Sequence, residues 1–151
     1  MTSYIGNFTL WFSLVLSFSQ FILSKNTKKF TMIKFNNLLT YGILIAISAS
    51  FFSLMYSYLI SDFSLKNVFF NSHTTKPLLY KITAVWGNHE GSMLLWMFVL
   101  AVFNYFIFKL YNKQNFIFIL KTLEIQSLIN LGFLTFIIFT SNPFERLIPT
   151  P

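Results

Sequence analysis

Four long apolar runs constrain this chain more than any other feature. They cover residues 4–23, 38–60, 92–108 and 122–140. Each is close to the roughly 20 apolar residues that a helix needs to cross the ~30 Å hydrocarbon core of a bilayer. Hydrophobic residues make up 55% of the chain and charged residues only 10%, which excludes an ordinary soluble domain. The sequence predicts an all-α, polytopic membrane protein, with one transmembrane domain over residues 1–151 and a long loop, residues 61–91, between the second and third spans.

The lysines predict how the spans are oriented. The connection between the first two spans and the one between the last two carry basic residues and no acidic ones. These basic residues are Lys25, Lys28, Lys29, Lys34, Lys109, Lys113 and Lys121. Such an excess of positive charge is typical of loops on the cytoplasmic or matrix side of a membrane. Both termini and the 61–91 loop are therefore expected to face the periplasm or the intermembrane space. Because the lysines follow the spans and form no basic stripe, the net charge of +7 does not indicate nucleic-acid binding.

Composition also points to a compartment. The chain contains 21 Phe together with many Ile, Leu, Asn and Lys, the mix expected from an AT-rich gene, so an organellar genome is the expected source. The first charged residue is Lys25, so the first span lacks the basic segment of a signal peptide and is expected to remain in the mature protein. With no cysteine, the chain has no disulfide and no thiolate metal ligand.

Polar and small residues within the spans are expected to pack helices together. A stripe of small residues recurs at steps of three and four along the second span, where another helix can approach closely. The stripe consists of Gly42, Ala46, Ala49, Ser53 and Ser57. Asn104, Gln126 and Asn130 are expected to hydrogen-bond between helices, and Glu124 to cap the amino end of the fourth helix. No span carries the buried charges that mark a transport pathway, so a transporter or channel is the least expected function.

The 61–91 loop is too long for a simple turn and is a candidate functional element. Residues 63–70 could form a short strand or an amphipathic segment on the bilayer surface, and the pattern does not choose between them. His73 lies in the polar run NSHTTK without a second ligand at metal spacing. It is interpreted as a solvated histidine, and no metal site is predicted.

The strongest candidate for chemistry is WGNHEGS, directly before the third span. Its motif residues are Trp86, Gly87, His89, Glu90, Gly91 and Ser92. His89 and Trp86 could lie next to a haem, because an imidazole can ligate the iron and an indole can stack on a porphyrin. Equally, Asn88 or Ser92 could cap the helix, and Trp86 could be an ordinary interface anchor. The residues alone favour this structural interpretation over direct ligation.

Four sequence blocks, in one order, connect the chain to a known family. They are Ile5-Gly6-Asn7, SDFSLKNVFFNS at 61–72, YKITAVWGNHEGSMLLW at 80–96 and TSNPFERLIP at 140–149. In these blocks the chain resembles the amino-terminal part of CcmF, the membrane subunit of the haem lyase in System I cytochrome c maturation. Asn88 departs from the small residue usual in that family, and His73 falls where the family has other polar residues.

The resemblance implies an amino-terminal subunit of a haem lyase, with haem as the cofactor of the assembled complex. The family receives haem from a chaperone and attaches it to the cysteines of apocytochrome c, and its tryptophan-rich WWD segment lies further along the polypeptide than this sequence extends. The chain is therefore expected to be a split-gene product of the mitochondrial inner membrane that works beside a separate WWD-bearing chain and is not catalytic alone. The alternative is a non-catalytic structural or assembly subunit of an inner-membrane respiratory complex.

Overall fold

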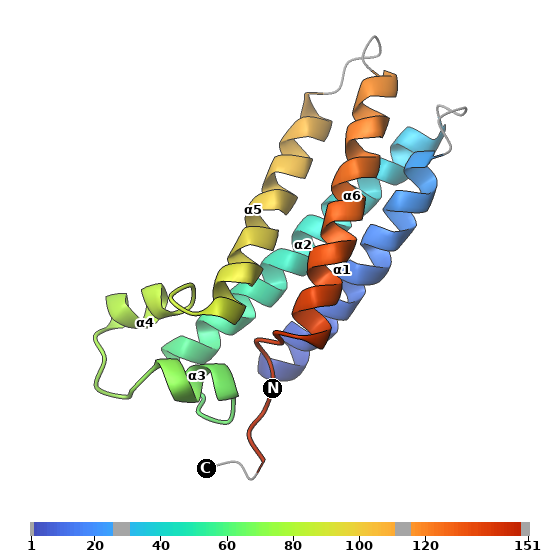
Figure 1. Ribbon diagram of the computed structural model, residues 1–151. Helices are drawn as coiled ribbons and strands as arrows, with labels where there is room; N and C mark the ends of the chain where they lie inside the picture. Colours follow the sequence, from blue (N-terminus) through green and yellow to red (C-terminus); the bar gives the residue numbers. More distant parts are fainter. Residues whose placement is uncertain (1, 26–30, 111–115, 149–151) are drawn as a thin grey trace.

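The chain folds as a bundle of long helices with two short helices at one end (Figure 1). The computed structural model describes residues 2–25, 31–110 and 116–148. Within these ranges the helices are α1 (Thr2–Lys25), α2 (Thr31–Leu59), α3 (Lys66–Asn71), α4 (Leu78–Ala84), α5 (His89–Lys109) and α6 (Phe116–Phe139). Four of these, α1, α2, α5 and α6, are long and apolar enough to cross a membrane, which confirms the predicted fold class. Lys28, Lys29, Lys113 and Pro149, which entered the sequence predictions, lie outside the described residues.

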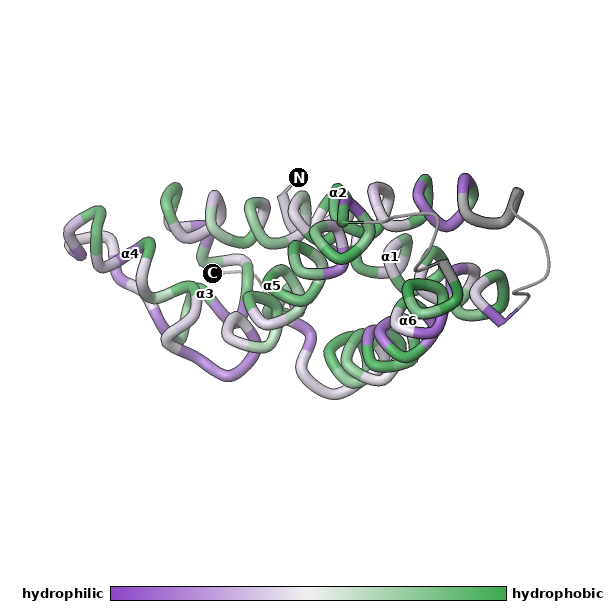
Figure 2. Tube along the Cα trace, turned by 90° about the horizontal axis from the view of Figure 1, so that it is seen from above, coloured by the Kyte–Doolittle hydropathy of each residue, from purple (hydrophilic) through white to green (hydrophobic). Residues whose placement is uncertain are grey.

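The four long helices form a closed ring of neighbours. α1 packs between α2 and α6, α2 also contacts α5, and α5 contacts α6. Buried residues such as Leu10, Ile47, Met97 and Leu134 form the core between them. The outer faces are also apolar, with exposed residues such as Phe8, Ile45 and Phe103. Figure 2 shows long hydrophobic stretches, coloured green, in the long helices. A helix that is apolar all round is suited to lipid on one side and protein on the other.

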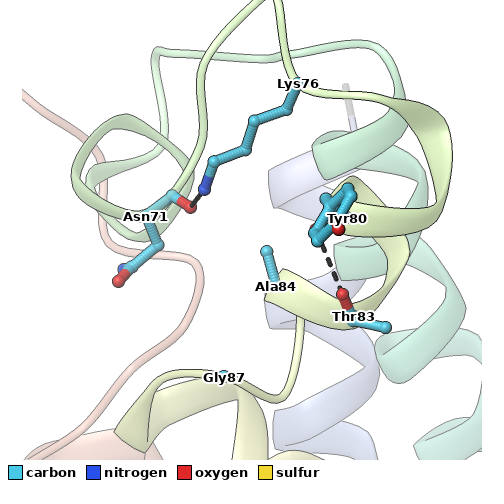
Figure 3. Close-up of a pocket in the computed structure, with 6 residues that line it drawn as sticks. All are labelled: Asn71, Lys76, Tyr80, Thr83, Ala84 and Gly87. Carbon is cyan, nitrogen blue, oxygen red and sulfur yellow. Dashed lines mark hydrogen bonds between the residues drawn. The ribbon is translucent and has the colours of Figure 1, made fainter.

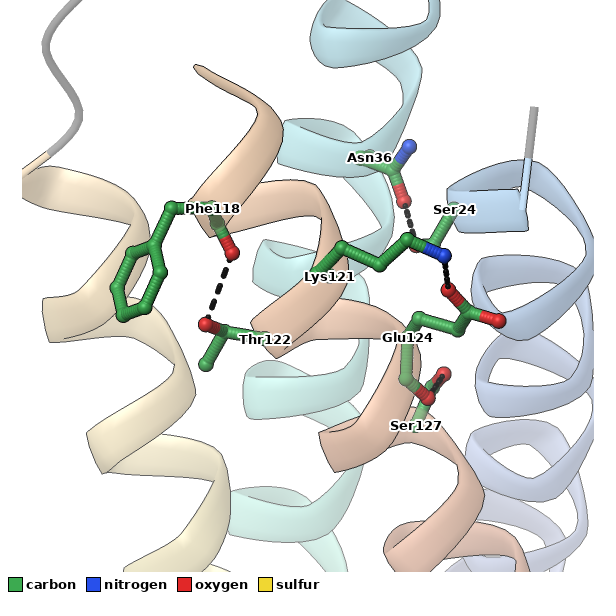
Figure 4. Close-up of polar contacts among 7 residues, drawn as sticks. All are labelled: Ser24, Asn36, Phe118, Lys121, Thr122, Glu124 and Ser127. Carbon is green, nitrogen blue, oxygen red and sulfur yellow. Dashed lines mark hydrogen bonds and ion pairs between the residues drawn. The ribbon is translucent and has the colours of Figure 1, made fainter. Parts of the chain in front are cut away.

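Polar contacts run along the seam between α1 and α2. The seam contains hydrogen bonds from Gln20 to the Thr40 hydroxyl (2.8 Å), Ser24 to the Asn36 side chain (2.9 Å, Figure 4), Ser50 to the Gly6 carbonyl (3.2 Å) and Ser53 to the Thr2 carbonyl (2.7 Å). Interhelical hydrogen bonds in lipid contribute about 0.6 kcal/mol each on average. Their spread over the whole seam fixes the register of the two helices.

The small residues of α2 lie largely at this seam. Gly42 lies beside Leu16 of α1, since a Cβ on Gly42 would lie 3.0 Å from the Leu16 side chain. Ser53 hydrogen-bonds to α1, Ala46 and Ser57 are buried, and Ala49 is half-buried. Gly42 and Ser53 of the stripe thus lie against α1.

Three amides in α5 and α6 behave differently from their prediction. Asn104 and Asn130 are buried, yet neither amide has a hydrogen-bond partner among the described residues. The amide nitrogen of Gln126 is also without a partner there. The predicted interhelical hydrogen bonds of Asn104 and Asn130 are therefore wrong, because position on the inward face of a helix does not by itself supply a polar group opposite.

Helix ends differ from the hydropathy boundaries. α2 begins at Thr31 and α6 at Phe116, where the apolar runs predicted 38 and 122. The added start of α2 contains polar residues such as Lys34 and Asn36, through which a helix of adequate propensity continues, whereas the added start of α6 is the apolar run FIFIL, which Lys121 separates from the predicted span. Glu124 consequently lies two turns inside α6, where it pairs with Lys121 at 2.8 Å (Figure 4), and its predicted role as a cap is wrong.

The connection from α2 to α5 carries the short helices α3 and α4. Ser61 lies just after the end of α2 and has a left-handed backbone (φ 55°). Its hydroxyl accepts a hydrogen bond from the Lys81 ammonium at 2.7 Å. Residues 63–70 are mostly helical from Lys66 onward, and Leu65 makes an isolated β-bridge with Arg146. The sequence left two forms open for this segment, a short strand and an amphipathic segment. In the described residues it forms no strand apart from this single bridge.

Candidate functional site

Segments far apart in sequence meet at the end of the bundle that carries α3 and α4 (Figure 1). Gly6 of α1 lies directly under the buried ring of Phe144, and a Cβ on Gly6 would overlap that ring. Next to this contact, the Asn142 amide donates to the Asn7 side-chain oxygen at 3.3 Å. The segment after α6 is therefore packed against the first turns of α1.

The same segment is paired with the start of α3. The Lys66 backbone N–H donates to the Glu145 carbonyl and the Leu147 N–H to the Ser64 carbonyl, both at 3.0 Å. The Lys66 and Glu145 side chains also form an ion pair at 3.1 Å, although both are about half exposed. Backbone pairing and the buried Phe144 ring, more than this exposed ion pair, hold the segment in place.

Asn88 fixes the start of α5. Its backbone is extended, and its side-chain oxygen accepts a hydrogen bond from the Gly91 N–H at 2.8 Å, as an N-cap residue does. Its amide nitrogen donates to the Ala84 carbonyl at 2.9 Å and so ties the end of α4 to the same point. Of the two caps proposed from the sequence, Asn88 has this role. Ser92 is exposed, and its hydroxyl donates to the His89 carbonyl at 2.9 Å.

Asn88 is also part of a polar cluster, which we call the capping cluster, formed by Tyr58, Asn67, Asn88 and Glu90. The Asn88 amide donates to the buried Tyr58 hydroxyl at 2.9 Å, and that hydroxyl donates to the Asn67 side-chain oxygen. The Asn67 amide donates to the Asn88 side-chain oxygen at 3.0 Å and to the Glu90 carboxylate at 3.4 Å. The cluster therefore joins the end of α2, the start of α3 and the start of α5.

Gly91 permits the close approach on which this turn depends. A Cβ on Gly91 would lie 2.8 Å from the Val85 carbonyl carbon and closer still to its oxygen. Val85 lies in the turn between α4 and α5 and is completely buried. Any side chain in place of Gly91 would force two backbone segments apart. Gly87 meets only ordinary contacts, with its nearest atoms at 3.6 to 3.7 Å.

His89 and Trp86 lie on the outside of this turn. The His89 imidazole is exposed and packs on the Phe136 ring of α6, with ring centroids 6.1 Å apart and planes at 27°. Its ring makes no hydrogen bond within the described residues. Trp86 is 38% exposed. The structure thus separates the motif into an inward capping part, Asn88, Glu90 and Gly91, and an outward part, Trp86 and His89.

An apolar groove of about 480 Å³ lies between α5 and α6 on the His89 side. It is lined by Met93, Ile129, Gly132, Phe133 and Phe136. An exposed imidazole beside an apolar groove is a combination of residues suited to haem. In the described residues no group of three or more His, Cys, Asp or Glu side chains gathers in a way that could hold a metal ion.

Two members of the capping cluster, Tyr58 and Asn67, were not identified from the sequence as site residues. Tyr58 lies in an apolar run and Asn67 in a segment whose form was left open. The signal for Asn67 was its place in the block at 61–72. Tyr58 had no local signal, because its partner Asn88 is 30 positions away.

Comparison with known proteins places this geometry in context. The chain is 49% identical over 105 residues to the cytochrome c-type biogenesis protein ccl1 of Rhodobacter capsulatus, covering 70% of this chain and 16% of that protein. It is 47% identical over 105 residues to CycK of Rhizobium meliloti, with the same coverage, and 40% identical over 111 residues to CcmF of Haemophilus influenzae, covering 74% of this chain and 17% of that protein. The chain thus spans about a sixth of the length of these relatives.

A solved structure shares the fold. The structure of "Cytochrome c Heme Lyase CcmF" superposes with a TM-score of 0.89 at 22% sequence identity, covering 96% of this chain and 25% of that one. No protein-family model matches the chain.

Proposed function

The chain belongs to the CcmF family of cytochrome c-type biogenesis proteins, and from this membership we propose that it forms the amino-terminal membrane portion of a haem lyase. In this role it supports covalent attachment of haem to apocytochrome c. The chemistry of attachment is completed by the WWD-bearing part of the lyase, which we propose is a separate chain. A haem chaperone and apocytochrome c are then partners of the assembled complex rather than of this chain alone.

The observation that carries the proposal is the coincidence of similarity and geometry. The four blocks that resemble the family lie at positions 5–7, 61–72, 80–96 and 140–149. The described parts of these blocks come together at one end of the bundle, through Gly6 against Phe144, Lys66 beside Glu145 and Asn67 bonded to Asn88. Separate sequence blocks that come together in one surface are expected when that surface has a function.

Within this surface, we assign the outward part of the motif to haem. His89 would bind the iron through an imidazole nitrogen, and Trp86 would offer an aromatic ring to the porphyrin. When bound, haem supplies the vinyl groups that are joined to the cysteines of apocytochrome c. The capping cluster acts on neither group directly. It holds the turn from which the Trp86 and His89 side chains project.

We further propose a mitochondrial inner-membrane location, with the end that carries α3 and α4 toward the intermembrane space. Basic residues Lys25, Lys34, Lys109 and Lys121 lie at the opposite end of the long helices, where the positive-inside rule places the matrix. This orientation puts the motif on the side where apocytochrome c is matured.

The test is purification of the tagged chain from its native membrane in mild detergent, with mass spectrometry and a visible spectrum of one sample. We expect a WWD-bearing chain and a haem absorption band. Recovery with respiratory-complex subunits, without haem and without a WWD-bearing chain, would instead support the alternative of a structural or assembly subunit.

The same sample tests the assignment of His89. We expect His89→Ala to weaken or shift the haem band while leaving the partner chains in place. His73→Ala is the matched control, because His73 is also exposed but lies in the polar loop before α4. An unchanged spectrum in His89→Ala would remove this residue from the haem site.

A further inference from the structure

A second pocket, distinct from the groove beside His89, lies between α3, α4 and the turn before α5 (Figure 3). Its volume is about 440 Å³, and it is lined by Asn71, Lys76, Tyr80, Thr83, Ala84 and Gly87. Asn71 and Lys76 form one side, Tyr80 and Thr83 of α4 form the other, and Gly87 lies at the edge. The lining is mixed in character, and none of the six residues is acidic.

The positive charge in this pocket has no acidic partner. The Lys76 ammonium donates to the Asn71 carbonyl at 2.8 Å and forms no ion pair in the described part of the chain. An ammonium group has three N–H donors, so this single bond leaves two for a ligand. The Thr83 hydroxyl, which now donates at 3.2 Å to the Leu79 carbonyl and at 3.3 Å to that of Tyr80, can turn toward an incoming oxygen. These donors suit an anion with several oxygens.

The surroundings of the pocket are exposed and apolar. α4 has no buried residue, and Leu78, Leu79 and Tyr80 are 67%, 68% and 62% exposed. In Figure 1, α4 lies beside the first turn of α5, displaced sideways from the bundle. Since α5 begins its apolar span at this level, α4 is expected to lie along the membrane surface. Apolar side chains next to a cationic head are the arrangement of an interfacial segment.

We propose that this pocket binds the phosphate group of a membrane phospholipid, with Lys76 as the charged contact and Leu78 and Leu79 of α4 against the acyl region. The inference is independent of the haem lyase function, because it uses neither His89 nor the capping cluster. Phosphate is the shared chemistry of a lipid headgroup and of free inorganic phosphate. The exposed apolar face of α4 favours the lipid, since a free ion would gain nothing from it.

The test is native mass spectrometry of the full chain, delipidated in detergent and titrated with phosphatidylglycerol. A basic residue near an anionic lipid surface contributes enough that its loss should weaken binding of the first lipid about five-fold. We therefore expect Lys76→Gln to lose about five-fold in affinity and Lys76→Arg to retain it. Lys66→Gln is the matched control, because it removes one positive charge at the same end of the molecule but lies outside the pocket.

Three outcomes would overturn the proposal. Unchanged lipid affinity in Lys76→Gln would exclude the pocket as the site. An equal loss in Lys66→Gln would show general attraction between the chain and anionic lipid. Displacement of the lipid by millimolar inorganic phosphate would assign the pocket to the free anion. Thermal unfolding of each variant, monitored by helical circular dichroism, verifies that the compared proteins are folded.

Discussion

Two glycines in the bundle have opposite surroundings and should respond in opposite ways to the same change. Gly91 approaches the Val85 backbone so closely that a methyl group has no space, whereas a Cβ on Gly132 would meet nothing within 4 Å. We expect Gly91→Ala to destabilise the protein by about 3 kcal/mol or more, because backbone cannot yield as a side chain can. Gly132→Ala should stabilise by about 0.5–1 kcal/mol through reduced freedom of the unfolded chain.

The measurement is thermal or denaturant unfolding in detergent, followed by circular dichroism. The two variants add the same atoms to the same kind of residue, so the Gly132 variant controls for any general effect of alanine. A Gly91 variant that unfolds like the original protein would contradict the close packing of the turn before α5.

Asn88 should matter through its hydrogen bonds rather than its bulk. Asn88→Ala removes the cap from the Gly91 N–H and leaves Tyr58 and Asn67 without this partner. Loss of a cap together with buried polar partners should cost about 1–2 kcal/mol. Ser92→Ala, four positions later and exposed, should change stability by no more than a few tenths of a kcal/mol.

A double-mutant cycle adds a sharper criterion to this prediction. If Asn88 and Tyr58 act through one cluster, Tyr58→Phe should cost less in the Asn88→Ala background than in the original protein. Strictly additive effects on the unfolding free energy would show that the two side chains act independently.

At the residue scale, the position of the motif could be predicted from the sequence, but not which of its side chains face inward and which face outward. The run from Trp86 to Ser92 was conspicuous because polar residues interrupt apolar sequence, and Asn88 was one of two proposed caps. The inward partners Tyr58 and Asn67 are 30 and 21 positions from Asn88, and no local pattern encodes such a pairing. Local propensity therefore predicted where the turn is, and tertiary packing decided which side chains face inward.

At the scale of elements, the type of each long helix was predictable and its ends were not. The apolar runs correspond to α1, α2, α5 and α6 because bilayer thickness imposes their length. The extra turns at the start of α2 contain polar residues, which hydropathy does not mark, whereas the extra turn at the start of α6 is apolar but is separated from the predicted span by Lys121. The short helices α3 and α4 depend on contacts with other elements, so neither periodicity nor length indicated them.

The segment after α6 should be held by one aromatic ring. Phe144 is buried against Gly6, whereas the nearby ion pair of Glu145 with Lys66 is exposed. We expect Phe144→Ala to cost about 3–5 kcal/mol, and Glu145→Gln to cost at most about 0.5 kcal/mol.

Limited trypsin digestion at Arg146, read by mass spectrometry, is a second measurement of the same prediction. Phe144→Ala should speed cleavage because the segment leaves the surface of α1, and Glu145→Gln should not. Equal protection in both variants would show that backbone pairing with residues 64–66 alone holds the segment.

At the scale of the whole molecule, charge distribution predicts orientation and the absence of cysteine makes it testable. The ends of the long helices that carry Lys25, Lys34, Lys109 and Lys121 lie at one end of the bundle, and α3, α4, the first turn of α1 and the last turn of α6 lie at the other (Figure 1). No residue of the native chain reacts with a maleimide as a thiol, so a single introduced cysteine is a clean reporter. Thr75 and Leu110 are exposed at opposite ends.

We expect a membrane-impermeant maleimide, added to mitochondria with an opened outer membrane, to label Thr75→Cys directly. Leu110→Cys should be labelled only after the inner membrane is permeabilised. The physical reason is the cost of moving several uncompensated lysines across the bilayer during insertion. Neither substitution alters a charge, so neither disturbs the property under test. The reverse labelling pattern would place the motif in the matrix, on the side away from apocytochrome c, and would contradict the proposed haem lyase function together with the orientation.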